Sequence, residues 1–194
     1  MGLLGGIAAG KSHVAGLFAG RGFAVLDADA EARAVVADPA VRQEIVARFG
    51  SSVLGPGGEL DRAALGRIVF ADPAARRDLE FLVHPGVRAR LLDGIDRARA
   101  AGRGVVLDVP LLLEGGLIAH CDSCVFLDAP DSVRAARAQQ RGWTEAEWAA
   151  REAAQAPLAD KRARCVFTVP TGGTREETRI AVDRVIDSLE RARR

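Results

Sequence analysis

The sequence lacks the features that would place it among secreted, disulfide-rich or membrane proteins. Its 194 residues include only three cysteines, an odd number that argues against a disulfide framework. No uninterrupted apolar run approaches the length needed to span a bilayer. The N-terminus lacks the basic segment and apolar stretch of a secretory signal. We therefore expect a cytoplasmic protein without a membrane partner.

An excess of charge of either sign is also absent. The net charge is +1 at pH 7, which gives no electrostatic footprint for nucleic acid or an anionic membrane. With 48% hydrophobic and 27% charged residues, the composition is that of an ordinary globular protein. The length suits one domain with a sizeable core, or one core carrying an inserted lobe. We expect a monomer that does not bind nucleic acid.

The cysteines could still suggest metal or redox chemistry, because Cys121 and Cys124 form a C-x-x-C motif. The third cysteine is Cys165, and no second C-x-x-C or H-x-x-x-H completes a zinc site. We interpret the pair as ordinary residues at the edge of a strand.

The strongest motif lies in the first dozen residues. Residues 5–12, GGIAAGKS, fit G-x-x-x-x-G-K-[ST], the phosphate-binding loop of nucleotide-binding proteins. Glycines can take positive φ values, so the backbone amides can wrap around a phosphate at the start of a helix. Lys11 would reach the β- and γ-phosphates of ATP, and the Ser12 hydroxyl would ligate Mg²⁺. The alternative is an ordinary glycine-rich turn before a helix. The ATP-binding residues predicted here are Gly6, Ile7, Ala8, Ala9, Gly10, Lys11, Ser12 and His13.

The segments around the loop predict the βαβ unit that the motif requires. Apolar residues recur at helical spacing over 14–18, and residues 20–22 are rich in glycine and end that helix. Residues 23–26 form a short apolar strand. The strand before the loop, at residues 2–4, is so brief that either it is very short or the true start lies upstream.

Two aspartates, Asp27 and Asp29, follow the second predicted strand. In extended backbone they would project to the same side. Functional sites in parallel sheets lie beyond the carboxyl ends of the strands, so each is a candidate general base or magnesium partner. The alternative is an aspartate that caps the next helix, and it applies most to Asp27.

Residues 30–100 are mostly helical by pattern, with strands predicted only before and after them. Asp38-Pro39 and Asp72-Pro73 each resemble a helix start, and residues 51–58 form a loop. We therefore expect a helical lobe inserted after the second strand. His84 lies in it before Pro85, as either a structural or a catalytic histidine.

The third predicted strand, at residues 105–108, ends in Asp108. A buried parallel strand that ends in an acid delivers a carboxylate to the ligand edge, where such an acid commonly orders the magnesium shell. Residues 124–128 and 165–169 are the last two strands. An amphipathic helix over 174–194 follows, with a predicted buried stripe of Ile180, Val185, Ile186 and Leu189.

Arginines are frequent in the segment between the last two strands. Arg134, Arg137 and Arg141 share one helix face by their spacing. They could stabilise charge on a phosphoryl group during transfer, or they could form a solvated helix face. A second helical piece begins near residue 143, and Pro157 interrupts it.

Together these residues predict phosphoryl transfer, and they resemble the dephospho-coenzyme A kinase family along essentially the whole chain. Beyond the phosphate loop, the likeness is carried by sequence segments around Asp29, Asp61, Asp72, His84, residues 108–114 and the lid arginines. It implies an α/β P-loop NTPase fold, a parallel five-stranded sheet flanked by helices, with a helical substrate-binding insertion and a helical lid. The implied reaction is phosphorylation of the ribose 3′-hydroxyl of dephospho-CoA by ATP, with Mg²⁺.

The resemblance also implies a division of the chain and roles for its residues. Residues 1–29, 103–136 and 164–194 would form the nucleotide core, 30–102 the acceptor lobe and 137–163 the lid. Lys11, Asp29, Arg137 and Arg141 would be catalytic, with Asp29 as the base. The acceptor would bind Asp29, His84, Pro110, Leu111 and Glu114, and Mg²⁺ would bind near Ser12 and Asp108.

Two departures from the family pattern affect the ATP site. The family usually has Gly-Ser or Gly-Ala where this chain has Ala8-Ala9, and an alanine tolerates positive φ poorly, so we expect a slightly reshaped loop. Thr171 stands where the family has an asparagine that helps hold the adenine, so the resemblance implies that Thr171 also belongs to the ATP-binding residues. A related nucleoside or nucleotide kinase, and an ATP-binding protein without catalysis, are the alternative functions.

Overall fold

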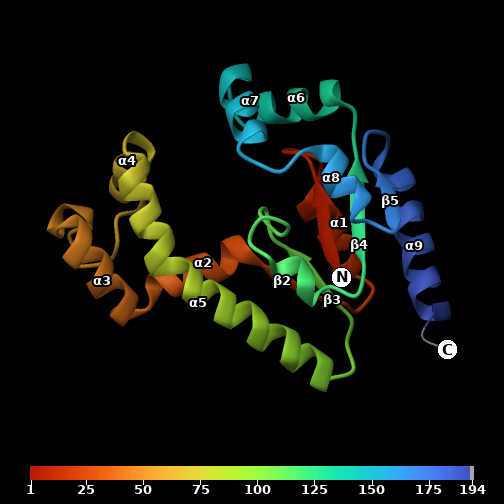
Figure 1. Ribbon diagram of the computed structural model, residues 1–194, viewed down its shortest axis with the longest axis horizontal. Coiled ribbons are helices and arrows are strands. Elements are labelled where there is room, and N and C mark those ends of the chain that lie inside the picture. Colours follow the sequence, from red (N-terminus) through yellow and green to blue (C-terminus); the bar gives the residue numbers. More distant parts are fainter. Residues whose placement is uncertain (193–194) are drawn as a thin grey trace. The chain divides into compact units, whose positions relative to one another are not determined.

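The computed structural model describes residues 1–192 and divides into two compact units (Figure 1). The core unit comprises Met1–Leu26 and Ala98–Arg194, and the helical unit comprises Asp27–Arg97. Each unit has a hydrophobic cluster of its own.

The core unit is built on a five-stranded parallel sheet with strand order β2-β3-β1-β4-β5, which confirms the predicted fold class. Its strands are β1 (Gly2–Gly5), β2 (Ala24–Asp27), β3 (Val105–Asp108), β4 (Cys124–Asp128) and β5 (Phe167–Pro170). The prediction placed the last strand two residues too early. Val166 is largely exposed, and although its amide donates to the Cys124 carbonyl at 3.2 Å, the strand itself begins at Phe167.

Helices occupy most of the remaining chain. They are α1 (Lys11–Ala19), α2 (Ala28–Ala37), α3 (Pro39–Phe49), α4 (Arg62–Ala71), α5 (Pro73–Ala100), α6 (Asp131–Gln140), α7 (Glu145–Ala153), α8 (Leu158–Ala163) and α9 (Arg175–Ala192). Two 3₁₀ turns, η1 (Ser51–Val53) and η2 (Leu117–His120), complete the pattern. Within residues 1–192, every helix is too short or too polar to cross a membrane.

Helices α1 and α9 pack together against the sheet, and Figure 1 shows α9 alongside β5. Leu3, Val106, Val125 and Val169 from four strands meet Phe18 of α1 in this cluster. The buried stripe of α9 differs from the prediction at one position. Ile180 is 39% exposed, whereas Thr178 and Val182 are buried with Val185 and Ile186. The stripe runs 178, 182, 185, 186, and position 180 falls on the opposite side of a 3.6-residue helix.

The first strand is short but central. β1 has four buried residues and pairs with β3 on one side and β4 on the other. The Met1 ammonium group donates to the Val105 carbonyl at 3.0 Å, and the Met1 carbonyl accepts from the Leu107 amide. A side chain at Gly2 would collide with Leu112. β1 is therefore a short strand that is buried on both sides by its neighbours.

The helical unit contains α2 to α4 and most of α5, with capping aspartates where the sequence predicts them. The Asp38 and Asp72 carboxylates accept from the amides of Ala40 and Ala74, each beyond a proline at the first helical position. Between residues 28 and 100, the described extended pairing is a single bridge between Leu54 and Leu60. The buried residues of this unit are Val35, Ile45, Val53, Leu65 and Val83.

Two helix glycines of this unit differ in the space around them. A Cβ at Gly86 of α5 would lie 2.9 Å from Val35 Cγ1, whereas a Cβ at Gly66 of α4 would meet nothing within 4 Å. We expect Gly66→Ala to stabilise the protein by about 0.5–1 kcal/mol, because glycine is the poorer helix former. Gly86→Ala should destabilise it by about 1 kcal/mol, since overpacking exceeds that gain. Urea unfolding of both variants measures the difference, and equal stabilisation would contradict the close α2–α5 packing.

Candidate phosphate-binding site

The predicted phosphate loop joins β1 to α1 and contains two left-handed residues. Gly10, the N-cap of α1, has φ 95°, a value that glycine adopts freely. Ala8 has φ 62° and is buried, so the loop keeps an alanine in a conformation that costs roughly 1–2 kcal/mol. The loop therefore accommodates alanine at position 8 through backbone strain, which is the change of loop conformation expected from the sequence.

Lys11 begins α1 and is half-buried beside several charged groups. Burial lowers its pKa, and the carboxylates of Asp108 and Glu152 act in the opposite direction. Asp108 ends β3, so its carboxylate reaches the loop from the neighbouring strand, as predicted. Ser12 and His13 lie in the exposed first turn of α1.

The structure brings the two predicted lid arginines to the phosphate loop. Arg137 donates from Nη2 to the Thr171 carbonyl at 2.6 Å, and its buried Nη1 has no hydrogen-bond partner among the described residues. A Cβ at Gly10 would lie 3.7 Å from that Nη1 atom. Arg141 caps the end of α6, and its charge lowers the pKa of Lys11. A solvated helix face therefore does not describe Arg137.

Thr171 follows β5, is buried, and lies near Gly10 at the end of the phosphate loop. Its amide donates to the Asp128 carbonyl at 2.8 Å, and its hydroxyl donates to the same oxygen at 3.4 Å. Its own carbonyl accepts from Arg137. The Thr171 side chain thus binds the backbone of the strand β4, and its peptide group orients Arg137.

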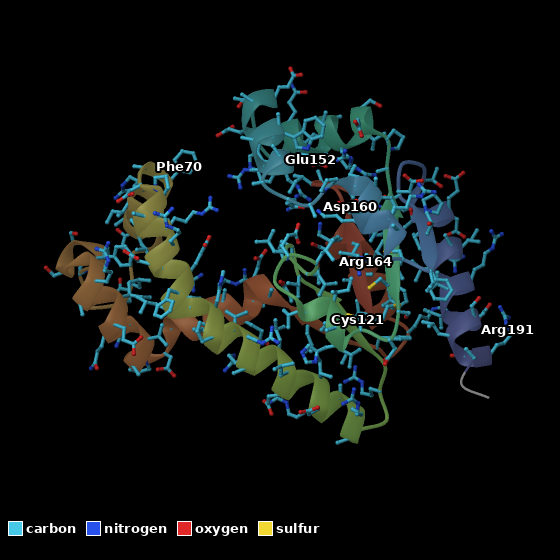
Figure 2. The ribbon with its side chains drawn as sticks, in the orientation of Figure 1. Phe70, Cys121, Glu152, Asp160, Arg164 and Arg191 are labelled. Atoms are coloured by element: carbon cyan, nitrogen blue, oxygen red, sulfur yellow. The ribbon has the colours of Figure 1, made fainter. Side chains whose placement is uncertain are left out.

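Arg134, from the predicted arginine face, and Glu152, for which no role was predicted, contact the loop backbone directly. Glu152, labelled on α7 in Figure 2, accepts at Oε2 from the Ile7 amide at 3.0 Å. Its Oε1 accepts from Arg134 Nη1 at 2.6 Å, and that nitrogen also lies 3.4 Å from the Ile7 carbonyl oxygen. The backbone N–H and C=O groups of Ile7 are therefore both bound by the Glu152–Arg134 ion pair. Helix spacing identified the arginine face, but no motif or periodicity distinguishes Glu152 from other helix-surface glutamates.

A third group of side chains connects the turn after β3 to the lid. Lys161 is buried, donates to Gln155 Oε1 at 2.6 Å and lies 4.0 Å from Glu114 Oε1. The Glu114 carboxylate also accepts from the Ala156 amide at 2.7 Å. Burial lowers the pKa of Lys161, against the charges of Glu114 and Glu152. Pro110 and Leu111 are exposed on the turn that precedes Glu114.

The remaining predicted residues belong to the helical unit. Asp27 is the N-cap of α2, and its Oδ1 accepts from the Asp29 amide at 2.8 Å, so the capping alternative describes Asp27. Asp29 is in the first turn of α2 and is exposed. The expectation that the two project together from extended backbone is wrong, because the strand ends at Asp27. His84 is exposed within α5.

The three cysteines form no disulfide bond among the described residues. Cys121, Cys124 and Cys165 are free thiols, and Cys124 begins β4. Cys165 donates to the Lys161 carbonyl at 3.2 Å. Residues 1–192 contain no cluster of three histidine, cysteine or acidic side chains placed to hold a metal ion.

Comparison with known proteins gives a consistent result. The family model described as dephospho-CoA kinase matches residues 1–176. The chain belongs to the dephospho-CoA kinase family. A dephospho-CoA kinase of Geobacillus kaustophilus is 43% identical, and the match covers 98% of each chain. One of Anaeromyxobacter dehalogenans is 46% identical over 100% of this chain and 93% of its own.

Solved structures agree with this assignment. A crystal structure of a Thermus thermophilus protein, 37% identical, superimposes with a TM-score of 0.78 and covers 97% of this chain and 96% of its own. A dephospho-CoA kinase from Campylobacter jejuni, 22% identical, supports the fold with a TM-score of 0.76 over 100% of this chain and 98% of its own. The family membership, the enzyme class and the fold predicted from the sequence are therefore confirmed.

The left-handed alanine gives a test of strain in the phosphate loop. Ala8 and Ala9 are both buried, but only Ala8 among the described non-glycine residues has positive φ. Ala9→Gly should destabilise the protein by about 1 kcal/mol through lost burial and added unfolded-state entropy. Ala8→Gly relieves the strain, so its free energy of unfolding should exceed that of Ala9→Gly by roughly 1–2 kcal/mol. Equal losses in denaturant unfolding would contradict a strained Ala8.

Proposed function

We propose that this protein transfers the γ-phosphoryl group of ATP to the ribose 3′-hydroxyl of dephospho-CoA, giving ADP and CoA. The observation that carries the proposal is the group of cations around the phosphate loop. Lys11, Arg137 and Arg141 belong to one compact unit and lie at a loop whose sequence fits the phosphate-binding motif. Family membership supports the acceptor.

The donor half of the site acts by positioning and electrostatics. The loop amides and the Lys11 ammonium would bind the β- and γ-phosphates. Arg137 Nη1, buried and without a partner among residues 1–192, is available for the phosphoryl oxygens on which charge develops. The Thr171 carbonyl would hold Arg137 in this orientation. In this role Thr171 would lie beside the nucleotide without contacting the adenine directly.

The oxygen donors at this site fit Mg²⁺ bound together with ATP. The Ser12 hydroxyl follows Lys11 in the loop, and the charge of Asp108 acts at Lys11 from the end of β3. Mg²⁺ is usually held by one or two protein oxygens together with substrate phosphates and water, so no cluster of acids is required. When bound, the ion would neutralise charge on the phosphates. Ser12 and Asp108 are the residues that would hold it.

The acceptor half would be supplied by the helical unit and the turn after β3. We propose that Asp29 accepts the proton of the 3′-hydroxyl as the oxygen attacks the γ-phosphorus. Its place in the first turn of α2 leaves the carboxylate exposed, while Asp27 serves as the helix cap. His84, Pro110 and Leu111 would contact dephospho-CoA. Glu114 would act through its contacts with Lys161 and the Ala156 amide.

The functional division of the chain follows from these roles. Residues 30–102 would bind the acceptor, and 137–163 would form a lid that excludes water, which would otherwise favour ATP hydrolysis. We expect the enzyme to act in the cytoplasm as a monomer, on ATP and dephospho-CoA, without nucleic-acid or membrane partners.

The acceptor is tested by a coupled assay of ADP release with dephospho-CoA, adenosine and AMP in parallel. We expect turnover with dephospho-CoA and little with the other two, because the helical unit would recognise the larger acceptor. Preferred turnover of adenosine or AMP would instead indicate a nucleoside or nucleotide kinase. ATP binding without turnover of any acceptor would indicate a protein that has lost catalysis.

The role of Asp29 is tested by Asp29→Asn. Loss of the base should lower kcat by about 10²–10⁴-fold, the range typical of general-base catalysis, while the dissociation constant of ATP stays nearly unchanged. Asp27→Asn is the matched control. Asparagine also caps helices, so this variant should retain most of the wild-type activity. Steady-state kinetics and calorimetric ATP titration provide the two readouts. Equal loss of ATP binding in Asp29→Asn would place Asp29 in the magnesium shell instead.

A further inference from the structure

A carboxylate of the protein occupies the mouth of the phosphate loop. Glu152 Oε2 accepts from the Ile7 amide at 3.0 Å, within the segment predicted to bind ATP phosphates. Gly6 allows this close approach, since a Cβ there would lie 2.9 Å from Glu152 Oε1 and would collide with Arg134. An acidic side chain is thus bound where the motif would place an anionic ligand.

The surroundings of Glu152 are those expected for a bound phosphate. Its carboxylate forms a 2.6 Å ion pair with Arg134, a residue that is only 2% exposed. Burial lowers the pKa values of Lys11 and Lys161, and the negative charge of Glu152 partly opposes this effect at both lysines. Glu152 is therefore bound by Arg134 and by a loop amide, and its charge also acts on two nearby lysines.

Arg134 has unused hydrogen-bonding capacity in this arrangement. It donates to Asp131 and Glu152, but its buried Nε has no partner among the residues described. Its guanidinium carbon lies 5.3 Å from the centre of the Trp148 ring. An arginine in this position could bind a phosphate through the same nitrogens that now bind Glu152.

We propose that Glu152 is an internal anion that closes the phosphate loop by binding Arg134 and the Ile7 amide, and that the terminal phosphates of ATP displace it and take over these contacts. The inference rests on the proposed use of ATP as donor. Glu152 and ATP cannot occupy this amide together, because two anions at one site repel each other. Each ATP molecule that binds must therefore move α7 or the Glu152 side chain.

The displacement makes Glu152 a competitor of ATP. The apparent dissociation constant equals the intrinsic constant divided by the fraction of protein with an open loop, so removing the competitor strengthens binding. If about a tenth of the molecules are open, Glu152→Gln should lower the dissociation constants of ATP and inorganic tripolyphosphate by about tenfold. AMP, which lacks the terminal phosphates, should bind the variant and the wild type equally.

The matched control is Glu145→Gln, which removes the same charge from the exposed start of α7. Calorimetric titration of ATP, tripolyphosphate and AMP into both variants should show the gain only for Glu152→Gln and only for the first two ligands. Unchanged or weaker ATP binding by Glu152→Gln, or an equal gain in Glu145→Gln, would overturn the proposal. Tripolyphosphate binding needs no acceptor, so absence of dephospho-CoA turnover would overturn the proposed function without affecting this result.

A second measurement does not depend on a variant at position 152. Trp143 and Trp148 are the two tryptophans, and Trp143 stacks on Arg151, 4.4 Å away. In Trp143→Phe, the fluorescence of Trp148 reports on the Arg134 guanidinium beside it. ATP and tripolyphosphate should change this emission when Glu152 leaves Arg134, and AMP should not. Saturation with ATP and no spectral change would contradict displacement.

Discussion

The convergence of positive charge on the phosphate loop is the constraint on which the rest of the core unit depends. Lys11, Arg134, Arg137 and Lys161 are each buried or half-buried. Burial of a cation is unfavourable unless an anion or a set of acceptors compensates for it. The chain supplies Asp108, Glu114 and Glu152 from three different elements, so the site folds as a mixed cluster rather than as a purely positive patch.

The same requirement explains how the lid elements are attached in this structure. α6 contributes Arg134 and Arg137, α7 contributes Glu152, and α8 contributes Lys161. These side chains contact the phosphate loop, Thr171 and Glu114. Since α7 contains no buried residue, polar contacts hold this helix in place. A ligand with negative charge can replace the carboxylate in such an ion pair, so the lid helices can exchange one anion for another. A hydrophobic contact offers no comparable exchange.

Much of the fold follows from local sequence signals. Apolar runs placed the strands to within two residues, and capping aspartates placed the starts of α3 and α5, because buried parallel strands and helix caps are decided by neighbouring residues. The errors arose where tertiary packing decides. The exposure of Ile180 depends on where α9 meets the sheet, and the start of β5 depends on pairing with β4. Asp27 and Asp29 were expected to project to the same side, but the strand ends at Asp27, which caps the next helix as the alternative for that residue proposed.

Residue type and motif position identify Lys11, Ser12 and Asp108 as candidates from the sequence, and their roles stay predictions. Glu152 carries no such signal, because a glutamate on an amphipathic helix usually faces solvent. Its significance comes from the placement of α7 beside Ile7, which sequence spacing cannot give. The Glu152 carboxylate places a negative charge on the loop, so a phosphate that binds there must displace it. A loop held in this way favours a ligand with enough negative charge to displace the carboxylate, and that condition selects a nucleoside triphosphate over a monophosphate.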